Sequence, residues 1–167
     1  MFELKPVAKE ALPRALEKAE HYRVLNEPHE AESICLDILD VDPKNEGAIV
    51  TLLLALTDQF RENRAKNFGR AEQLLSSLSD AYSRAYYGGI ILERSAKARV
   101  AQGDPGARYR AFDEFREAMH EYELAIAARP AGNEDSILRW NACARFLNRH
   151  PEVHGEPTTD TQEQMLE

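Results

Sequence analysis

The stretch LPRALEKAEHYRVLNEPHEAESICLDILDVDP, residues 12–43, decides the fold class. Its apolar residues recur at steps of three and four, the period of an amphipathic helix, and Pro28 divides the stretch into two such helices. Pro43 ends the second helix, because the residue before a proline is disfavoured in the α region. Ala19 and Ala31 are small, and small side chains at a crossing let two helix axes approach closely. The stretch therefore predicts a tightly packed helical hairpin.

The same helical period continues through the chain, and no convincing alternation of apolar and polar residues indicates a strand. Asn45 and Asp80 are predicted N-caps, and Gly103 is predicted to end a helix. The expected helices cover residues 12–26, 28–42, 45–61, 68–79, 80–102, 108–128 and 135–149, with a polar, basic loop at 61–67. The sequence therefore predicts an all-α fold of about seven helices.

Three segments have small residues where two helices are expected to cross. The first and the last also have an aromatic residue beside them and a closing proline. They are Ala19, Tyr22, Ala31 and Pro43 in the first, Ala71, Leu75 and Leu78 in the middle, and Ala118, Tyr122, Ala125 and Pro130 in the last. This pattern resembles the tetratricopeptide repeat (TPR), a helix–turn–helix unit of 34 residues. In the third segment either Gly88 or Gly89 takes the small-residue position.

The resemblance covers about residues 12–149 and implies an α-solenoid of antiparallel helix pairs. We expect three degenerate pairs and a capping helix at 135–149, because each pair cannot bury its own apolar face. The TPR-like domain is assigned to residues 1–150. Residues 151–167 have few apolar side chains, five acidic residues and no Lys or Arg, and are expected to form a disordered acidic tail.

Composition excludes several classes of protein. The 167 residues are 43% hydrophobic, which suffices for a core, and no apolar run approaches the roughly 20 residues of a membrane span. The first residues lack the pattern of a signal peptide, and Cys35 and Cys143 are expected to be reduced core thiols, so we expect a cytoplasmic location and no membrane. The formal net charge of -8 disfavours nucleic-acid binding, since such binding depends on cation contacts to phosphates.

No catalytic, cofactor-binding or metal-binding residues are assigned. His29-Glu30 and His120-Glu121 lack the second histidine of an HExxH motif, and Gly88-Gly89 follows no strand and has no phosphate-loop context. No serine or cysteine has an identifiable His and Asp relay. We therefore expect a protein that is not an enzyme and uses no cofactor.

The resemblance implies a binding scaffold in which the first helix of each pair lines a concave groove. By the repeat register, the groove is lined by Leu16, Glu20 and Arg23 in helix 12–26, by Val50, Leu54, Thr57 and Asp58 in helix 45–61, and by Tyr82 or Tyr86 with Arg94 in helix 80–102. Apolar patches there would contribute affinity, and isolated charges would set orientation. The expected ligand is a peptide or partner protein of unknown identity. The chain itself is expected to be a monomer or a homodimer.

Two alternatives remain open at this point. Four cations, Arg61, Arg64, Lys66 and Arg70, lie within ten residues and could hold an anion or a nucleic acid. A solvated loop is the more common explanation of such a stretch. The length and negative charge also resemble those of small secretion chaperones built from three such repeats.

Overall fold

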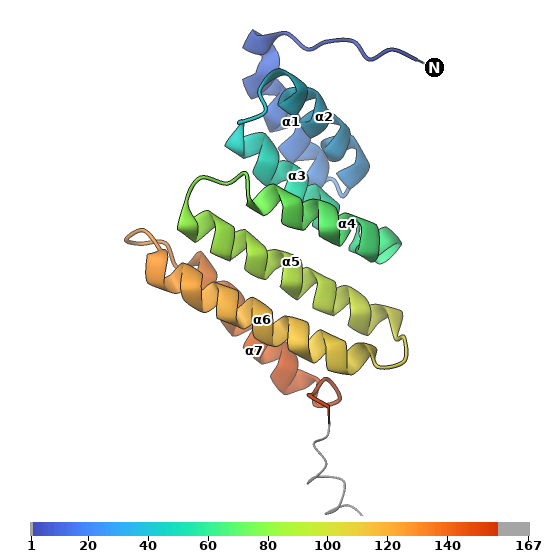
Figure 1. The fold of residues 1–167 in the computed structure, drawn as a ribbon, viewed down its shortest axis with the longest axis vertical. Coiled ribbons are helices and arrows are strands. Elements are labelled where there is room, and N and C mark those ends of the chain that lie inside the picture. The colour runs from blue at the N-terminus through green and yellow to red at the C-terminus, as the bar shows by residue number, and fades with distance from the viewer. Residues whose placement is uncertain (1, 157–167) are drawn as a thin grey trace, which may run out of the picture.

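The computed structural model describes residues 2–156 and is all-helical over that range (Figure 1). A short 3-10 helix, η1 (Lys9–Ala11), leads into α1 (Leu12–Val24). The helices that follow are α2 (Pro28–Val41), α3 (Glu46–Asp58), α4 (Phe60–Leu75), α5 (Ala81–Gln102), α6 (Ala107–Ala128) and α7 (Asp135–Arg149). The prediction of an all-α chain of about seven helices is confirmed for the described residues. None of the helices in residues 2–156 combines the length and the apolar character that crossing a membrane requires.

The predicted helix ends rest on local hydrogen bonds. The Asn45 side chain accepts a hydrogen bond from the Ala48 backbone N–H at 3.0 Å, and Asp80 accepts one from the Ser83 N–H at 2.8 Å. These bonds satisfy N–H groups that have no partner within their own helix. The bonds from Ser83 also hold the pKa of the Asp80 carboxyl below its usual value. Gly103 ends α5 with φ 71°, a left-handed conformation that glycine adopts without a Cβ penalty.

The loop predicted at residues 61–67 is wrong, because α4 begins at Phe60 and continues through it. A kink at Asn63, with φ −150° and ψ 74°, interrupts the helix near its start. Phe60, Asn67 and Ala71 are buried along one side of α4, while most of the polar residues between them face solvent. A helix with so few buried positions has a weak apolar period, so the sequence pattern did not reveal it.

The helices follow one another along the long axis of the molecule, from α1 and α2 at one end to α6 and α7 at the other (Figure 1). Each helix packs against the next one in sequence. In addition, α1 packs on α3 and α3 packs on α5, so these odd-numbered helices lie side by side. Side chains that point outward from this common side can therefore form one continuous row.

The buried residues form two large clusters and one small one. The first lies among α1 to α5 and contains Leu53, Leu56, Phe60 and Ile91, and the second lies among α5 to α7 and contains Phe115, Tyr122 and Cys143. The small cluster joins Leu12, Ile38 and Ala48 at the α1 end. The half-buried Leu54 packs against both large clusters. The core is thus divided along the long axis.

The described part of the chain extends to residue 156, into the segment that was predicted to form the acidic tail. Val153 is only 3% exposed and packs in the cluster among α5 to α7. A Cβ added at Gly155 would be 3.4 Å from the Phe112 ring, so this segment runs along α6. The contacts of Val153 with the core and of His154 with the Tyr109 ring therefore hold residues 151–156 on the helices. The rest of the predicted tail, residues 157–167, lies outside the described residues.

Both cysteine thiols are inaccessible to solvent, and this predicts a loss of stability in alkaline solution. Burial raises the pKa of Cys35 and of Cys143 to about 12. In the unfolded chain a cysteine thiol has a pKa of about 8.5. As the pH rises between these values, the unfolded state loses protons that the folded state keeps. The free energy of unfolding should then fall by about 1 kcal/mol per thiol between pH 8 and 9.5.

Urea unfolding at both pH values measures this loss. A Cys35→Ala/Cys143→Ala variant serves as the control and should show a flatter pH dependence. Equal slopes for the variant and the wild-type chain would contradict the assignment to the two thiols. A thiol reagent added at pH 8 should likewise react only after unfolding, because the thiolate is the reactive form.

Candidate functional site

A row of polar side chains crosses the common side of α1, α3 and α5. Asp58, near the end of α3, accepts a hydrogen bond from Nε of Arg23 on α1 at 2.8 Å. Its second oxygen pairs with Nη1 of Arg94 on α5. One carboxylate therefore joins two arginines from helices that are more than thirty residues apart in sequence. We call Arg23, Thr57, Asp58 and Arg94 the arginine row.

Arg94 is the most strongly held member of the arginine row. Its Nη1 donates to the Thr57 hydroxyl at 2.7 Å, and Thr57 in turn donates to the Leu54 carbonyl at 2.8 Å. Burial lowers the pKa of Arg94 from its ordinary value, while Asp58 acts in the opposite direction. An arginine remains protonated under such conditions. The arginine row therefore presents two fixed cations against one carboxylate.

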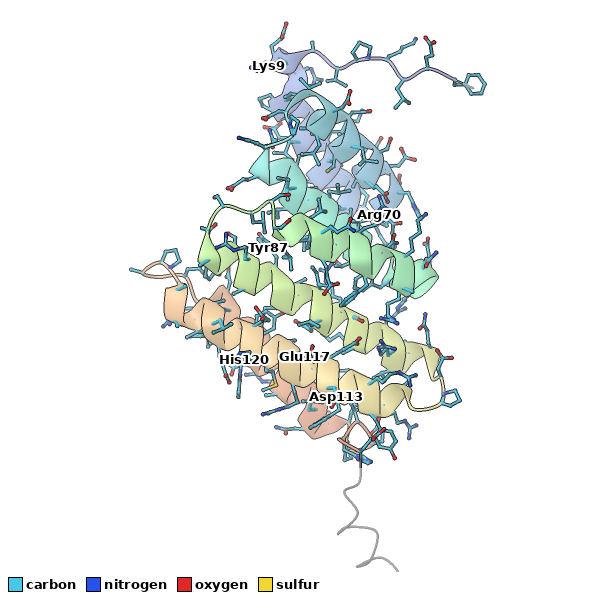
Figure 2. All side chains as sticks on the ribbon, in the orientation of Figure 1. Lys9, Arg70, Tyr87, Asp113, Glu117 and His120 are labelled. Atoms are coloured by element: carbon cyan, nitrogen blue, oxygen red, sulfur yellow. The ribbon has the colours of Figure 1, made fainter. Side chains whose placement is uncertain are left out.

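Tyrosines extend this side of the molecule along α5. The rings of Tyr82 and Tyr86 stack with centroids 5.6 Å apart, and Tyr87 meets Tyr86 edge-on at 5.2 Å. The Tyr82 hydroxyl donates to Asn133 at 3.2 Å, in the turn before α7. Tyr87 lies near the start of α5 in Figure 2. These rings are half-buried, so each offers an apolar face and a polar tip to the surface.

A second ionic network, which sequence analysis missed, joins α5, α6 and α7. Its centre is Glu93, which is 0% exposed and accepts a hydrogen bond from the Tyr122 hydroxyl at 2.6 Å. Lys97 and Arg139 also form ion pairs with the Glu93 carboxylate, and the Arg139 pair measures 3.5 Å. Burial raises the pKa of Tyr122, and the adjacent carboxylate adds to this effect. The tyrosine is therefore a neutral donor.

The sequence did contain a signal for this buried acid. Glu93 is four residues after Gly89 and three before Ala96, so it lies on a stripe of small residues along a helix. An acid in that position is buried wherever the stripe meets another helix. Lys97 follows at the i+4 position, where it can pair with Glu93.

The structure brings together six of the ten predicted groove residues, in two groups. Arg23, Thr57, Asp58 and Arg94 form the arginine row, and Tyr82 and Tyr86 stack on each other. The remaining four are placed as follows: Leu16 and Leu54 pack against core clusters, Val50 is half-buried, and Glu20 is exposed. Leu16 lies against the α3 backbone, where a Cβ at Gly47 would be 2.6 Å from its Cδ2. Leu16 is therefore half-buried and packs between α1 and α3.

The basic stretch 61–70 is partly used within the molecule. Arg64 of α4 donates to Ser95 at 3.2 Å and pairs with Glu114 at 3.8 Å. Arg70, also on α4 (Figure 2), pairs with Glu32 of α2. Two of the four cations therefore have carboxylate partners on neighbouring helices, and the stretch presents less positive charge than its sequence indicates.

Other chemistry is sparse in the described part of the chain. Residues 2–156 contain no group of three or more His, Cys, Asp or Glu side chains arranged to hold a metal ion. Comparisons with protein-family models, with curated proteins and with solved structures find no match to this chain. The site must therefore be interpreted from its own geometry.

Proposed function

We propose that this chain is a non-enzymatic interaction module, a TPR-like array of stacked helix pairs, that acts in the cytoplasm. It binds a peptide or a partner protein along the side shared by α1, α3 and α5. The observation that carries the proposal is the arginine row, which joins three helices across a single surface. No enzyme activity and no cofactor are part of this proposal.

The packing order supports a stacked array. Each helix packs on its neighbour in sequence, and the odd-numbered helices α1, α3 and α5 also pack on one another. In repeat arrays each unit contacts only its neighbours, and the resulting extended surface binds other chains. The gradual progression of helices along the long axis in Figure 1 agrees with such an arrangement.

The chemistry of this surface suits recognition of another chain. Arg23 donates through Nε, which leaves its two Nη groups without a partner in residues 2–156. Such groups can donate to a carboxylate or a backbone carbonyl of a ligand. The stacked Tyr82 and Tyr86 add apolar contact area with little loss of side-chain entropy, as is typical of binding surfaces.

The test is affinity purification with partner identification, followed by titration of the purified partner. An Arg23→Ala/Tyr82→Ala variant should bind that partner at least about tenfold more weakly, because it loses a charged donor and an aromatic contact. The matched control is Arg70→Ala, which removes an ion-paired arginine from α4. Equal affinity of all three proteins for the partner would refute the proposed binding surface.

A further inference from the structure

An open apolar groove lies away from the arginine row. It runs between α4 and α6, with α5 as its floor, and has a volume of about 620 Å³. Its apolar lining includes Leu75, Gly88, Ile91, Leu92 and Leu124, and we call it the α4–α6 groove. Gly88 and Arg94 are six residues apart, which places them on different sides of α5. The groove and the arginine row are therefore separate surfaces.

The α4–α6 groove is open to solvent and is as large as a typical ligand pocket. Its volume falls within the roughly 300–1,000 Å³ of typical ligand pockets. Leu124 on its α6 wall is 48% exposed, so apolar surface remains in contact with water. Such a contiguous apolar patch indicates an interaction site more often than a scattered exposed leucine does.

A second unpartnered apolar feature is the segment that precedes η1. Residues 2–8 contain no helix. Residues 4–7 line a hollow beside Leu36, Asp37 and Asp40 of α2, and the chain before them runs outward from the helices in Figure 1. Phe2 and Leu4 are 101% and 89% exposed. In an extended chain, residues two apart point to the same side, so these two side chains form one apolar edge. We call residues 2–8 the arm.

The charges of the arm and the groove are complementary. Glu72 on α4 and Glu121 on α6 lie on the two walls of the groove, and Arg84 lies on α5 between them. The arm carries Lys5 and Glu3 on the side opposite its apolar edge. With the apolar edge in the groove, Glu3 and Lys5 face outward, and the long Lys5 side chain can turn back to the exposed Glu72 on the α4 wall.

The arm is too short to fill the groove of its own molecule. Val7 packs on the small cluster at the α1 end and fixes the base of the arm. Leu4, three residues away, reaches at most about 11 Å from it. The groove floor is α5, two helix packings from α1, and packed helix axes are about 8–10 Å apart. An arm that fills this groove therefore belongs to a second molecule.

We propose that the arm of one copy docks into the α4–α6 groove of a second copy, with Phe2 and Leu4 inserted and Lys5 on the acidic rim. Two copies that exchange arms form a closed dimer, whereas one-way docking continues into longer assemblies. Burial of two large apolar side chains per arm drives the association.

The test measures the assembly state of the full chain by sedimentation at several concentrations. We expect a concentration-dependent dimer or longer assembly. Phe2→Glu/Leu4→Glu in the arm and Leu124→Glu in the groove should each weaken association at least about tenfold, because each places a charge in an apolar contact. The matched control is Leu138→Glu, at a leucine of α7 that is 62% exposed and lies outside the groove, and it should associate like the wild-type chain. Circular dichroism checks that every variant keeps its helices.

Mixing the two defective variants makes the test specific. The arm variant keeps an intact groove and the groove variant keeps an intact arm, so the mixture should form a heterodimer although neither forms a homodimer. A synthetic peptide of residues 2–8 should also bind the arm variant and should not bind Leu124→Glu. A wild-type chain that stays monomeric, an arm variant that associates normally, or a mixture that stays monomeric would each overturn the proposal.

Discussion

Replacing Gly89 with alanine should lower the free energy of unfolding by about 1–3 kcal/mol, as overpacking of a core does. A Cβ at this position would be 2.5 Å from Cε1 of Tyr122 and 2.7 Å from its Cδ1. The ring cannot simply move aside, because Tyr122 is fully buried and its hydroxyl is bonded to Glu93 at 2.6 Å. The strain therefore falls on the α5–α6 crossing itself. Thermal or urea unfolding measures the loss.

The adjacent Gly88 provides the matched control. A Cβ there would be 3.6 Å from Glu121 and 3.7 Å from Leu75, which is ordinary van der Waals contact. Gly88→Ala should be neutral or should stabilise the chain by up to about 1 kcal/mol, since alanine favours a helix more than glycine. In a Tyr122→Leu background, Gly89→Ala should cost less than it does in the wild-type chain, because the ring that the new Cβ would meet is absent. Equal effects of the two glycine substitutions would show that the crossing is placed incorrectly.

Removing the buried carboxylate of Glu93 should also lower the free energy of unfolding strongly. Glu93→Ala should reduce the free energy of unfolding by about 2–4 kcal/mol, because it leaves the buried Tyr122 hydroxyl without its acceptor and also empties space between helices. Lys97 and Arg139 have side chains that are partly exposed, so both can turn towards water and add less to the loss. Urea unfolding at neutral pH measures it.

The matched control is Glu123→Ala on α6. Glu123 also accepts a hydrogen bond from an aromatic residue, Nε1 of Trp140 at 3.1 Å, but it lies on the surface. Its loss should cost no more than about 0.5 kcal/mol. Tyr122→Phe should fall between the two, because it removes the donor and leaves the carboxylate its cations. A loss no larger for Glu93→Ala than for Glu123→Ala would argue against a buried network.

Much of the helical layout could be predicted because its signals are local. Asn45 and Asp80 cap helices through bonds to residues three positions away, and Gly103 ends one through its own φ. The start of α4 at Phe60 was missed because it has no such local signal. Its buried residues are sparse, and Phe60 is stabilised partly by contact with core residues far away in sequence.

The candidate site was predicted in part. The repeat register selected Arg23, Asp58 and Arg94 as facing one surface, but it did not reveal that one carboxylate joins both arginines. Leu16 was assigned to the groove, and the structure adds that its side chain packs against Gly47, because α1 and α3 approach closely there. Register gives the direction in which a side chain points, whereas the distance between two helices decides what that side chain meets.

About seven helices and most of their ends could be predicted from the sequence, because caps, prolines and apolar periods act over a few residues. The packing of the helices was needed to show that Gly89 lies at the α5–α6 crossing and that Gly88 lies in a groove. It also decided that Glu93 is buried while most acids are exposed. Because α3, α4 and α6 all pack against α5, these contacts fix the rotation of α5 about its own axis. That rotation decides which of its side chains are buried.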